Sequence, residues 1–183
     1  MRRLSLNSSY NSDTEKTAAL SRTPSEMHRG CAPSRSDPRK QPRENEMQIT
    51  RNSIETAPGP GDWFTGSVYI DTVAVPAEPS RIQAASVHFT PGARTAWHTH
   101  PNGQTIYVTE GIGLAQRRGG TIEMIRPGDR VFFDAGEEHW HGATASRFMT
   151  HLALQQVDDQ GSAVTWGDHV TDEEYSAAPT ATQ

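Results

Sequence analysis

Cysteine is nearly absent from this chain of 183 residues, since Cys31 is the single example. One cysteine excludes an internal disulfide framework and any zinc finger built on cysteine ligands, and it favours a reducing cytoplasm as the compartment. The sequence also lacks a run of about 18 or more apolar residues, which excludes a membrane-spanning helix. No apolar stretch follows Arg2 and Arg3, so we expect no secretory signal peptide.

Positive charge is also in short supply. The chain has 17 Lys and Arg against 22 Asp and Glu, a formal net charge of −5. An acidic chain is poorly suited to bind a polyanion, because the long-range field repels phosphates. We therefore expect neither nucleic acid nor a membrane as a partner.

The first third of the chain has almost no material for a core. None of the 5 Phe or 4 Trp precedes Trp63, and residues 1–46 are rich in Ser, Arg, Pro and Asn without a sustained apolar period. Such a segment cannot bury enough surface to offset its ordering entropy. We predict a disordered extension over 1–46, with Met47 as an alternative natural start, one domain over 47–178 and a disordered tail over 179–183.

The rest of the chain predicts an all-β fold. Short runs with β-branched and aromatic residues are separated by Gly and Pro turn signals, a spacing typical of sandwiches and barrels. A short C-terminal helix is predicted where Thr171 can act as N-cap with Glu174 three residues later, as in a capping box. The predicted strands cover residues 63–70, 82–89, 105–109, 111–117, 121–125, 129–133, 139–143 and 148–156.

Histidines form the most informative pattern. His98 and His100 are two residues apart, so in a strand they point to the same face, and His139 comes from a distant segment. Two imidazoles on one strand face and a third from another strand can hold a divalent metal, with the amide oxygen of Gln104 as a neutral fourth ligand. His-x-His pairs also occur commonly as surface or core histidines that bind no metal. Trp97 and Trp140, which adjoin His98 and His139, can likewise be core aromatics with no role in a site.

The spacing around these histidines resembles the two motifs of the cupin superfamily, whose fold is a double-stranded β-helix or jelly-roll barrel. Gln104 stands where many cupins have a Glu ligand, and Asp134 and Ala143 stand where Pro and Asn are frequent. A neutral Gln leaves the charge of the ion uncompensated and favours a Lewis acid that binds an anionic or alkoxide oxygen. The motifs read Gly92-x5-His98-x-His100-x3-Gln104-x6-Gly111 and Gly128-x5-Asp134-x-Gly136-x2-His139-x3-Ala143.

A closer resemblance is to the small bacterial cupins that act as manganese-dependent hydroxynitrile lyases. It covers about residues 47–178 and includes the segments 62–66, 92–105, 126–129, 138–143, 149–153 and 170–175. The resemblance implies a carbon–carbon lyase that cleaves a cyanohydrin, or forms it from an aldehyde and cyanide, with Mn²⁺ as Lewis acid and a homodimer or homotetramer as the assembly. The ligands themselves do not identify the ion, because three imidazoles and an amide also accept Fe, Zn, Ni or Co.

The same resemblance assigns roles to individual residues. It implies His98, His100, Gln104 and His139 as metal ligands, and it places five residues in the pocket: Ala85, Val87, His141, His151 and Gln155. Strand alternation fits this independently, because residues 85 and 87 share one face and 151, 153 and 155 share another.

His151 or His141 is the expected proton carrier to departing cyanide. The alternatives are that His151 only orients a ligand or water, and that His141 hydrogen-bonds to Gln104. His88 has the opposite parity to Val87 and should face outward, His169 should lie at the surface, and Arg94 is expected at an acidic neighbour or an interface.

Two other functions compete with the lyase. One is a metal-dependent dioxygenase or decarboxylase that acts on a small organic acid. The other is a non-catalytic module that binds a small ligand. Oxygen consumption would identify the first, and tight retention of a ligand without turnover would identify the second.

Overall fold

The computed structural model describes residues 47, 49–51 and 55–178 of the chain. The predicted extension over 1–46 and the predicted tail over 179–183 lie outside the described residues. The regular structure of the described part consists of antiparallel strands and one short helix, α1 (Asp172–Ser176), near its end. None of the helices among the described residues has the length and apolar character needed to cross a membrane.

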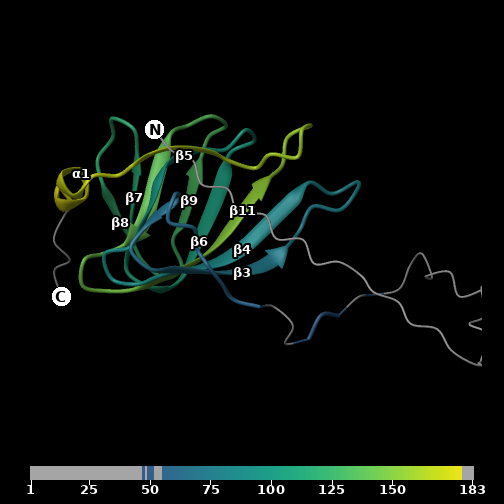
Figure 1. Cartoon of the computed structure of the whole chain (residues 1–183), viewed down its shortest axis with the longest axis horizontal. Helices are drawn as coiled ribbons and strands as arrows, with labels where there is room; N and C mark the ends of the chain where they lie inside the picture. Colours follow the sequence, from purple (N-terminus) through teal and green to yellow (C-terminus); the bar gives the residue numbers. More distant parts are fainter. Residues whose placement is uncertain (1–46, 48, 52–54, 179–183) are drawn as a thin grey trace, which may run out of the picture. The chain divides into compact units, whose positions relative to one another are not determined.

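Two antiparallel sheets, with six strands in each, form the barrel (Figure 1). The first sheet has the order β1 (Ala57–Pro58), β3 (Val68–Ala74), β4 (Ile82–Phe89), β11 (Met149–Gln156), β6 (Gln104–Gly111) and β9 (Arg130–Phe133). The second has the order β12 (Thr165–His169), β5 (Arg94–Thr99), β10 (His139–Ala143), β7 (Gly113–Arg117) and β8 (Glu123–Ile125), and β2 (Phe64–Thr65) pairs with β5. The predicted all-β jelly roll with a C-terminal helix is confirmed.

The strand predictions differ from the structure in a few places. The predicted strand 63–70 is two strands, β2 and β3, separated by a turn at Gly66, whose φ is 79°. The predicted strand 111–117 begins at Gly113, because Gly111 has a φ of 76° and a side chain there would meet the Phe148 carbonyl. Only glycine fits such a position. The strands β5 and β12 were not among the predicted runs, since they are rich in polar residues.

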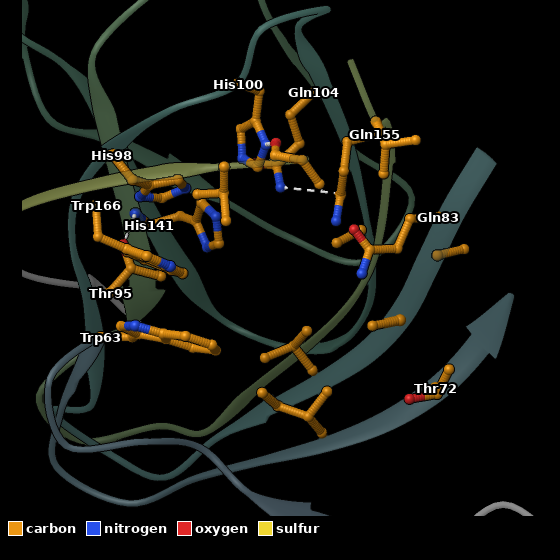
Figure 2. Close-up of a pocket in the computed structure, with 18 of the residues that line it drawn as sticks. Trp63, Thr72, Gln83, Thr95, His98, His100, Gln104, His141, Gln155 and Trp166 are labelled. Carbon is orange, nitrogen blue, oxygen red and sulfur yellow. Dashed lines mark hydrogen bonds between the residues drawn. The ribbon is translucent and has the colours of Figure 1, made fainter. Parts of the chain in front are cut away.

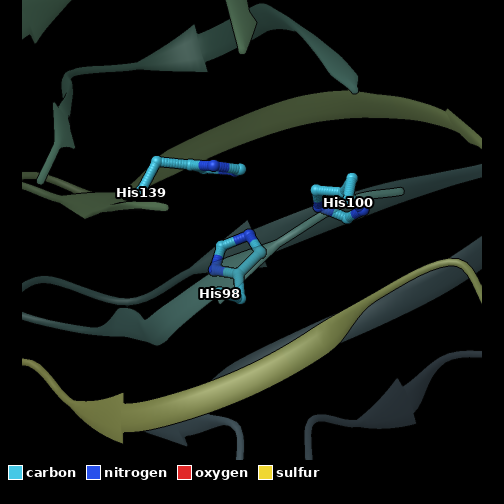
Figure 3. A group of neighbouring side chains, drawn as sticks. All are labelled: His98, His100 and His139. Atoms are coloured by element: carbon cyan, nitrogen blue, oxygen red, sulfur yellow. The ribbon is translucent and has the colours of Figure 1, made fainter. Parts of the chain in front are cut away.

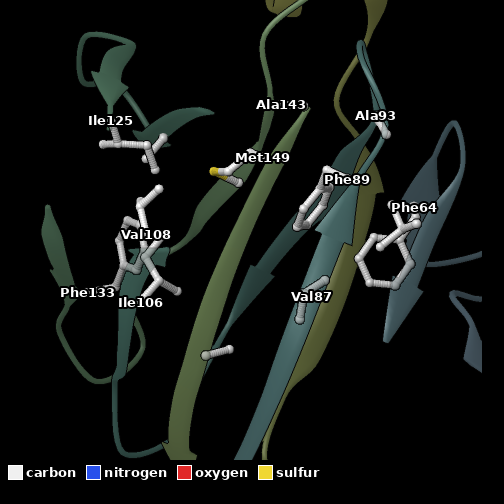
Figure 4. Packing of buried hydrophobic residues seen from close by; sticks show 13 residues of the cluster. Phe64, Val87, Phe89, Ala93, Ile106, Val108, Ile125, Phe133, Ala143 and Met149 are labelled. Carbon is white, nitrogen blue, oxygen red and sulfur yellow. The ribbon is translucent and has the colours of Figure 1, made fainter. Parts of the chain in front are cut away.

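Inward-facing side chains of both sheets make the main core (Figure 4). Phe89, Ile106, Val108 and Met149 are at most 1% exposed, and they come from neighbouring strands of the first sheet. Each such side chain stabilises the fold by about 1.5–3 kcal/mol through burial. The core fills one part of the space between the sheets, and the histidines occupy another.

A second apolar cluster covers the outer face of the second sheet. It contains Trp97, Leu114, Trp140 and Val170, and Tyr175 of helix α1 packs against it. The two tryptophans therefore point away from the cavity, as in the interpretation of these residues as core aromatics. The indole of Trp140 donates a hydrogen bond to Gln116 Oε1 at 2.7 Å, which satisfies its buried N–H.

Arg94 ties the C-terminal segment to this outer face. Its guanidinium is buried, donates to the Val170 carbonyl from Nε and Nη2 at 3.1 and 2.9 Å, and lies over the ring of Tyr175 at 4.6 Å. Nη2 also donates to Asp172 Oδ1 at 2.6 Å, so the expected acidic neighbour is confirmed. Thr171 forms the predicted capping box with Glu174. The segment 170–175, which includes most of α1, is therefore held against β5.

Replacing Arg94 should loosen that attachment. We expect Arg94→Leu to lower the free energy of unfolding by about 2 kcal/mol, because the Val170 carbonyl loses its charged donor. Asp172→Ala should cost no more than about 1 kcal/mol, since its carboxylate is exposed to solvent. Urea denaturation of the two variants measures both values. Equal losses in the two variants would contradict this role of Arg94.

Candidate metal centre and cavity

The pairing of β5 with β10 brings the three predicted histidine ligands together. His139, at the start of β10, lies directly opposite His98 in the register of the two strands, and His100 follows the end of β5. One ring nitrogen from each histidine lies within 4.8 Å of the others, and all three residues are buried. Figure 3 shows the three imidazoles gathered around a common centre.

Backbone carbonyls fix which nitrogen of each ring faces that centre. In each ring Nδ1 donates to a backbone carbonyl. His98 donates to Ala96 at 2.9 Å, His100 to Ala163 at 2.6 Å and His139 to Glu137 at 2.7 Å. A donating Nδ1–H leaves the lone pair on Nε2. Nε2 of His100 is buried and has no hydrogen-bond partner among the described residues. Three lone pairs therefore converge where a cation would satisfy them.

Gln104, the predicted fourth ligand, lies at the start of β6 beside the triad. Its Oε1 lies 3.2 Å from Nε2 of His139, and its Nε2 donates to Gln155 Oε1 at 3.3 Å. Since an amide ligates a metal through oxygen, the side chain is turned the right way for coordination. The donor set of three neutral imidazoles and one amide oxygen fits a divalent first-row metal and leaves positions for a substrate if the ion is octahedral.

Burial keeps these imidazoles neutral. Desolvation lowers the pKa of His139 to about 4 and holds the pKa of His98 well below its ordinary value, with the neighbouring His139 adding to the effect at His98. Desolvation also lowers the pKa of His100. Phe133 stacks on His139 with ring centroids 3.7 Å apart, which closes the back of that ligand. Only the neutral ring can bind a metal, so burial prepares the site for an ion.

A cavity of about 420 Å³ is lined by His98 and His100 of the triad (Figure 2). All five predicted pocket residues, Ala85, Val87, His141, His151 and Gln155, line it. Within the part of the chain that the structure describes, no Lys, Arg, Asp or Glu lines this cavity. The space is therefore suited to a small uncharged molecule.

His141 and His151 form a pair inside the cavity. His151 Nε2 and His141 Nδ1 lie 3.2 Å apart, so one of these two nitrogens carries the shared proton. The alternative hydrogen bond from His141 to Gln104 does not form among the described residues, because Nδ1 of His141 faces His151 and its Nε2 has no hydrogen-bond partner. Desolvation lowers the pKa of His151 to about 3 and that of His141 well below its ordinary value.

The structure adds cavity residues that the sequence did not single out. Trp63 and Trp166 stack with ring centroids 5.2 Å apart and an interplanar angle of 10°. Trp166 also packs against His98, with ring centroids 4.8 Å apart. Thr95 also lines the cavity, and its Oγ1 accepts a hydrogen bond from the backbone N–H of His141 at 3.2 Å. The register of β12 against β5 pairs Trp166 with His98. This register depends on tertiary structure, so the local sequence does not predict it.

Two further histidines of the described residues, His88 and His169, lie away from the cavity, as expected. His88 is on the outer face of the first sheet, where Nε2 lies 2.9 Å from Asp71 Oδ2 and Nδ1 lies 3.1 Å from Thr150 Oγ1. His169 is exposed at the end of β12. Neither histidine can reach an ion at the triad.

Known proteins are similar to this chain in sequence and in fold. The family model described as "Cupin domain" matches residues 85–153. A protein named (R)-mandelonitrile lyase, from Granulicella tundricola, is 56% identical over 130 residues, which cover 70% of this chain and 98% of that protein. The chain belongs to the cupin family.

Solved structures place this cupin among small relatives. A cupin-like protein from Thermotoga maritima has a TM-score of 0.62 and 33% identity over 73% of this chain and 98% of its own. A cupin-2 domain from Rhodospirillum rubrum has a TM-score of 0.54 at 13% identity, over 72% of this chain and 85% of its own, and shows the fold alone.

The buried histidines predict how the metal-free protein responds to acid. Their folded-state pKa values are lowered, so below about pH 6.5 the unfolded chain binds protons that the folded cupin does not. Stability is therefore full above that pH and is lost as the pH falls, by about 1.4 kcal/mol per pH unit for each such proton. Urea denaturation of chelator-treated protein between pH 7 and 5 measures this slope.

His151→Gln supplies the control for this experiment. It removes one of the buried imidazoles, so the slope should shrink by about one proton. A free energy of unfolding that does not change between pH 7 and 5 would contradict the burial of neutral imidazoles.

Proposed function

We propose that this cupin is a metal-dependent hydroxynitrile lyase, which cleaves a cyanohydrin such as mandelonitrile to an aldehyde and cyanide, or runs the reverse addition. The name of the Granulicella relative supports this activity, and so does the histidine triad at the end of the cavity. Mn²⁺ is the proposed ion on the strength of the family resemblance. The homodimer or homotetramer and the cytoplasmic location stay predictions.

The observation that carries the proposal is the uncharged cavity in front of a candidate metal centre. A cyanohydrin is neutral and has one hydroxyl oxygen to place at the ion. A small organic acid could pair its carboxylate with the ion alone, because the described lining offers no Lys or Arg. A neutral cyanohydrin needs no such partner from the walls, and its hydroxyl is the group that the ion would acidify, so the lining is compatible with the lyase.

The aromatic and aliphatic walls suit the rest of the substrate. Trp63 and Trp166 offer flat surfaces on the β12 side, and Ala85 and Val87 of β4 lie across the cavity. An aryl ring stacks well on an indole, with ring centroids about 4.5–7 Å apart. The walls therefore orient the aryl group while the hydroxyl faces His98 and its neighbours.

Cleavage requires one proton to leave oxygen and one to reach carbon. When bound, the metal supplies Lewis acidity, which lowers the pKa of the substrate hydroxyl. Burial lowers both pKa values, so the His141–His151 pair starts neutral with a lone pair that can take the acidified proton, and once protonated it gives the proton up readily. The carbon–carbon electron pair then leaves with cyanide as the carbonyl forms, and the protonated pair returns the proton to cyanide.

The first test is benzaldehyde release from racemic mandelonitrile at mildly acidic pH, where spontaneous cleavage is slow. Mn²⁺-loaded protein should release benzaldehyde. Chelator-treated protein and His98→Ala should show only the spontaneous rate in buffer, because the first has no ion and the second has two imidazole ligands left, which hold the ion poorly. His88→Ala removes a histidine of the outer face and should keep the wild-type rate. A metal-loaded wild type with no rate above buffer would contradict the lyase.

A second test separates proton transfer from metal binding. His151→Ala should lower turnover by about 10²–10⁴-fold, the usual contribution of a positioned acid–base group. The bound metal should stay at the wild-type level, because His151 is not among the triad. Metal analysis beside the rate measurement checks both. Loss of the metal in this variant would make the role of His151 structural.

A further inference from the structure

The amide of Gln104 has two different ends, and only one of them can serve a metal. The oxygen Oε1 has lone pairs to donate, whereas the NH₂ group carries two hydrogens and has no lone pair to offer. In the structure Oε1 lies 3.2 Å from Nε2 of His139, on the side of the triad. A rotation of the terminal torsion by half a turn would present the NH₂ group to the triad instead.

A neighbouring glutamine holds the other end of that amide. Nε2 of Gln104 donates to Oε1 of Gln155 at 3.3 Å, and Gln104 is 4% exposed. Gln155 lies on β11 and is the direct cross-strand partner of Gln104 on β6. Because a buried NH₂ group needs an acceptor, this contact favours the orientation with oxygen toward the triad.

The contact belongs to a row of three glutamines. Gln155 is the register partner of Gln83 on β4 as well as of Gln104, so the row crosses three adjacent strands. All three side chains line the cavity, and Figure 2 shows them along one wall, with the hydrogen bond between Gln104 and Gln155 dashed. Within the described residues, the Gln104 amide donates to Gln155 and not to Gln83, which makes Gln83 a matched control of the same residue type.

We propose that Gln155 is a positioning residue for the metal centre: it fixes the Gln104 amide with its oxygen toward the triad and strengthens that oxygen as a ligand. This rests on the proposed metal site. An acceptor on the N–H side draws electron density toward Oε1, so the ligand becomes more basic, as other outer partners of metal ligands do. Gln155 thus raises ion affinity without touching the ion.

Mn²⁺ binding measures this role without any turnover. The six-line electron paramagnetic resonance signal of free Mn²⁺ disappears on binding, so titration of apo protein gives the dissociation constant. We expect Gln155→Leu to weaken binding by about 10–100-fold, the usual effect of removing such an outer partner. Gln155→Glu keeps an acceptor oxygen at the same place and should restore the affinity. Gln83→Leu should bind Mn²⁺ as the wild type does.

A double-variant cycle shows whether Gln155 acts through Gln104. In a Gln104→Leu background, Gln155→Leu should cause no further loss, because the amide it positions is gone. The bound-Mn²⁺ spectra of Gln155→Leu and Gln104→Leu should also resemble each other. An equal loss in both backgrounds, or a loss in Gln83→Leu as large as in Gln155→Leu, would overturn the proposal.

The outcomes separate this inference from the proposed lyase. Mn²⁺ bound at wild-type affinity by a folded Gln155→Leu overturns the positioning role alone. Mn²⁺ bound without cleavage of mandelonitrile overturns the lyase alone, and a wild type that binds no Mn²⁺ overturns both. Circular dichroism of each apo variant checks folding, and Gln155→Val, a residue suited to strands, replaces the Leu variant if that variant does not fold.

Discussion

Three backbone carbonyls fix the orientation of the three histidine rings, on which the candidate metal centre depends. By accepting Nδ1–H from the triad, the oxygens of Ala96, Ala163 and Glu137 leave every Nε2 lone pair facing one point. Two of these carbonyls lie two residues before the histidine they serve, while Ala163 comes from the segment that leads into β12. The centre therefore depends on the closure of the second sheet as well as on the strands that carry the ligands. Without that closure His100 would lose its orienting partner.

The ligand set was predictable from sequence because it follows short-range geometry. A strand repeats every two residues, so His98 and His100 had to share a face, and the glycines at fixed spacing supplied the turns that bring in Gln104 and His139. The pocket positions on β4 and β11 came from the family resemblance, and strand alternation agreed with them. All of these positions line the cavity, although Ala84, which has the opposite parity to Ala85, lines it as well.

Other parts of the site could not be predicted from local pattern. Trp166 lies in a polar strand whose only guide is its register against β5, and that register depends on the whole sheet. The His141–His151 contact joins strands of different sheets, so no spacing predicts it. The orientation of the Gln104 amide likewise depends on Gln155, which is 51 residues away in the chain. Long-range pairing, rather than propensity, sets these features.

The alternation of histidine and tryptophan on β5 and β10 also protects the site from faulty assembly. His98 and His139 point inward, while their neighbours Trp97 and Trp140 pack outside beneath the C-terminal segment. A slip of either strand by one residue would push an indole into the cavity and an imidazole into the apolar cluster. Both faces would then lose stability together, so a barrel with a misregistered metal centre is also a barrel that does not stay folded.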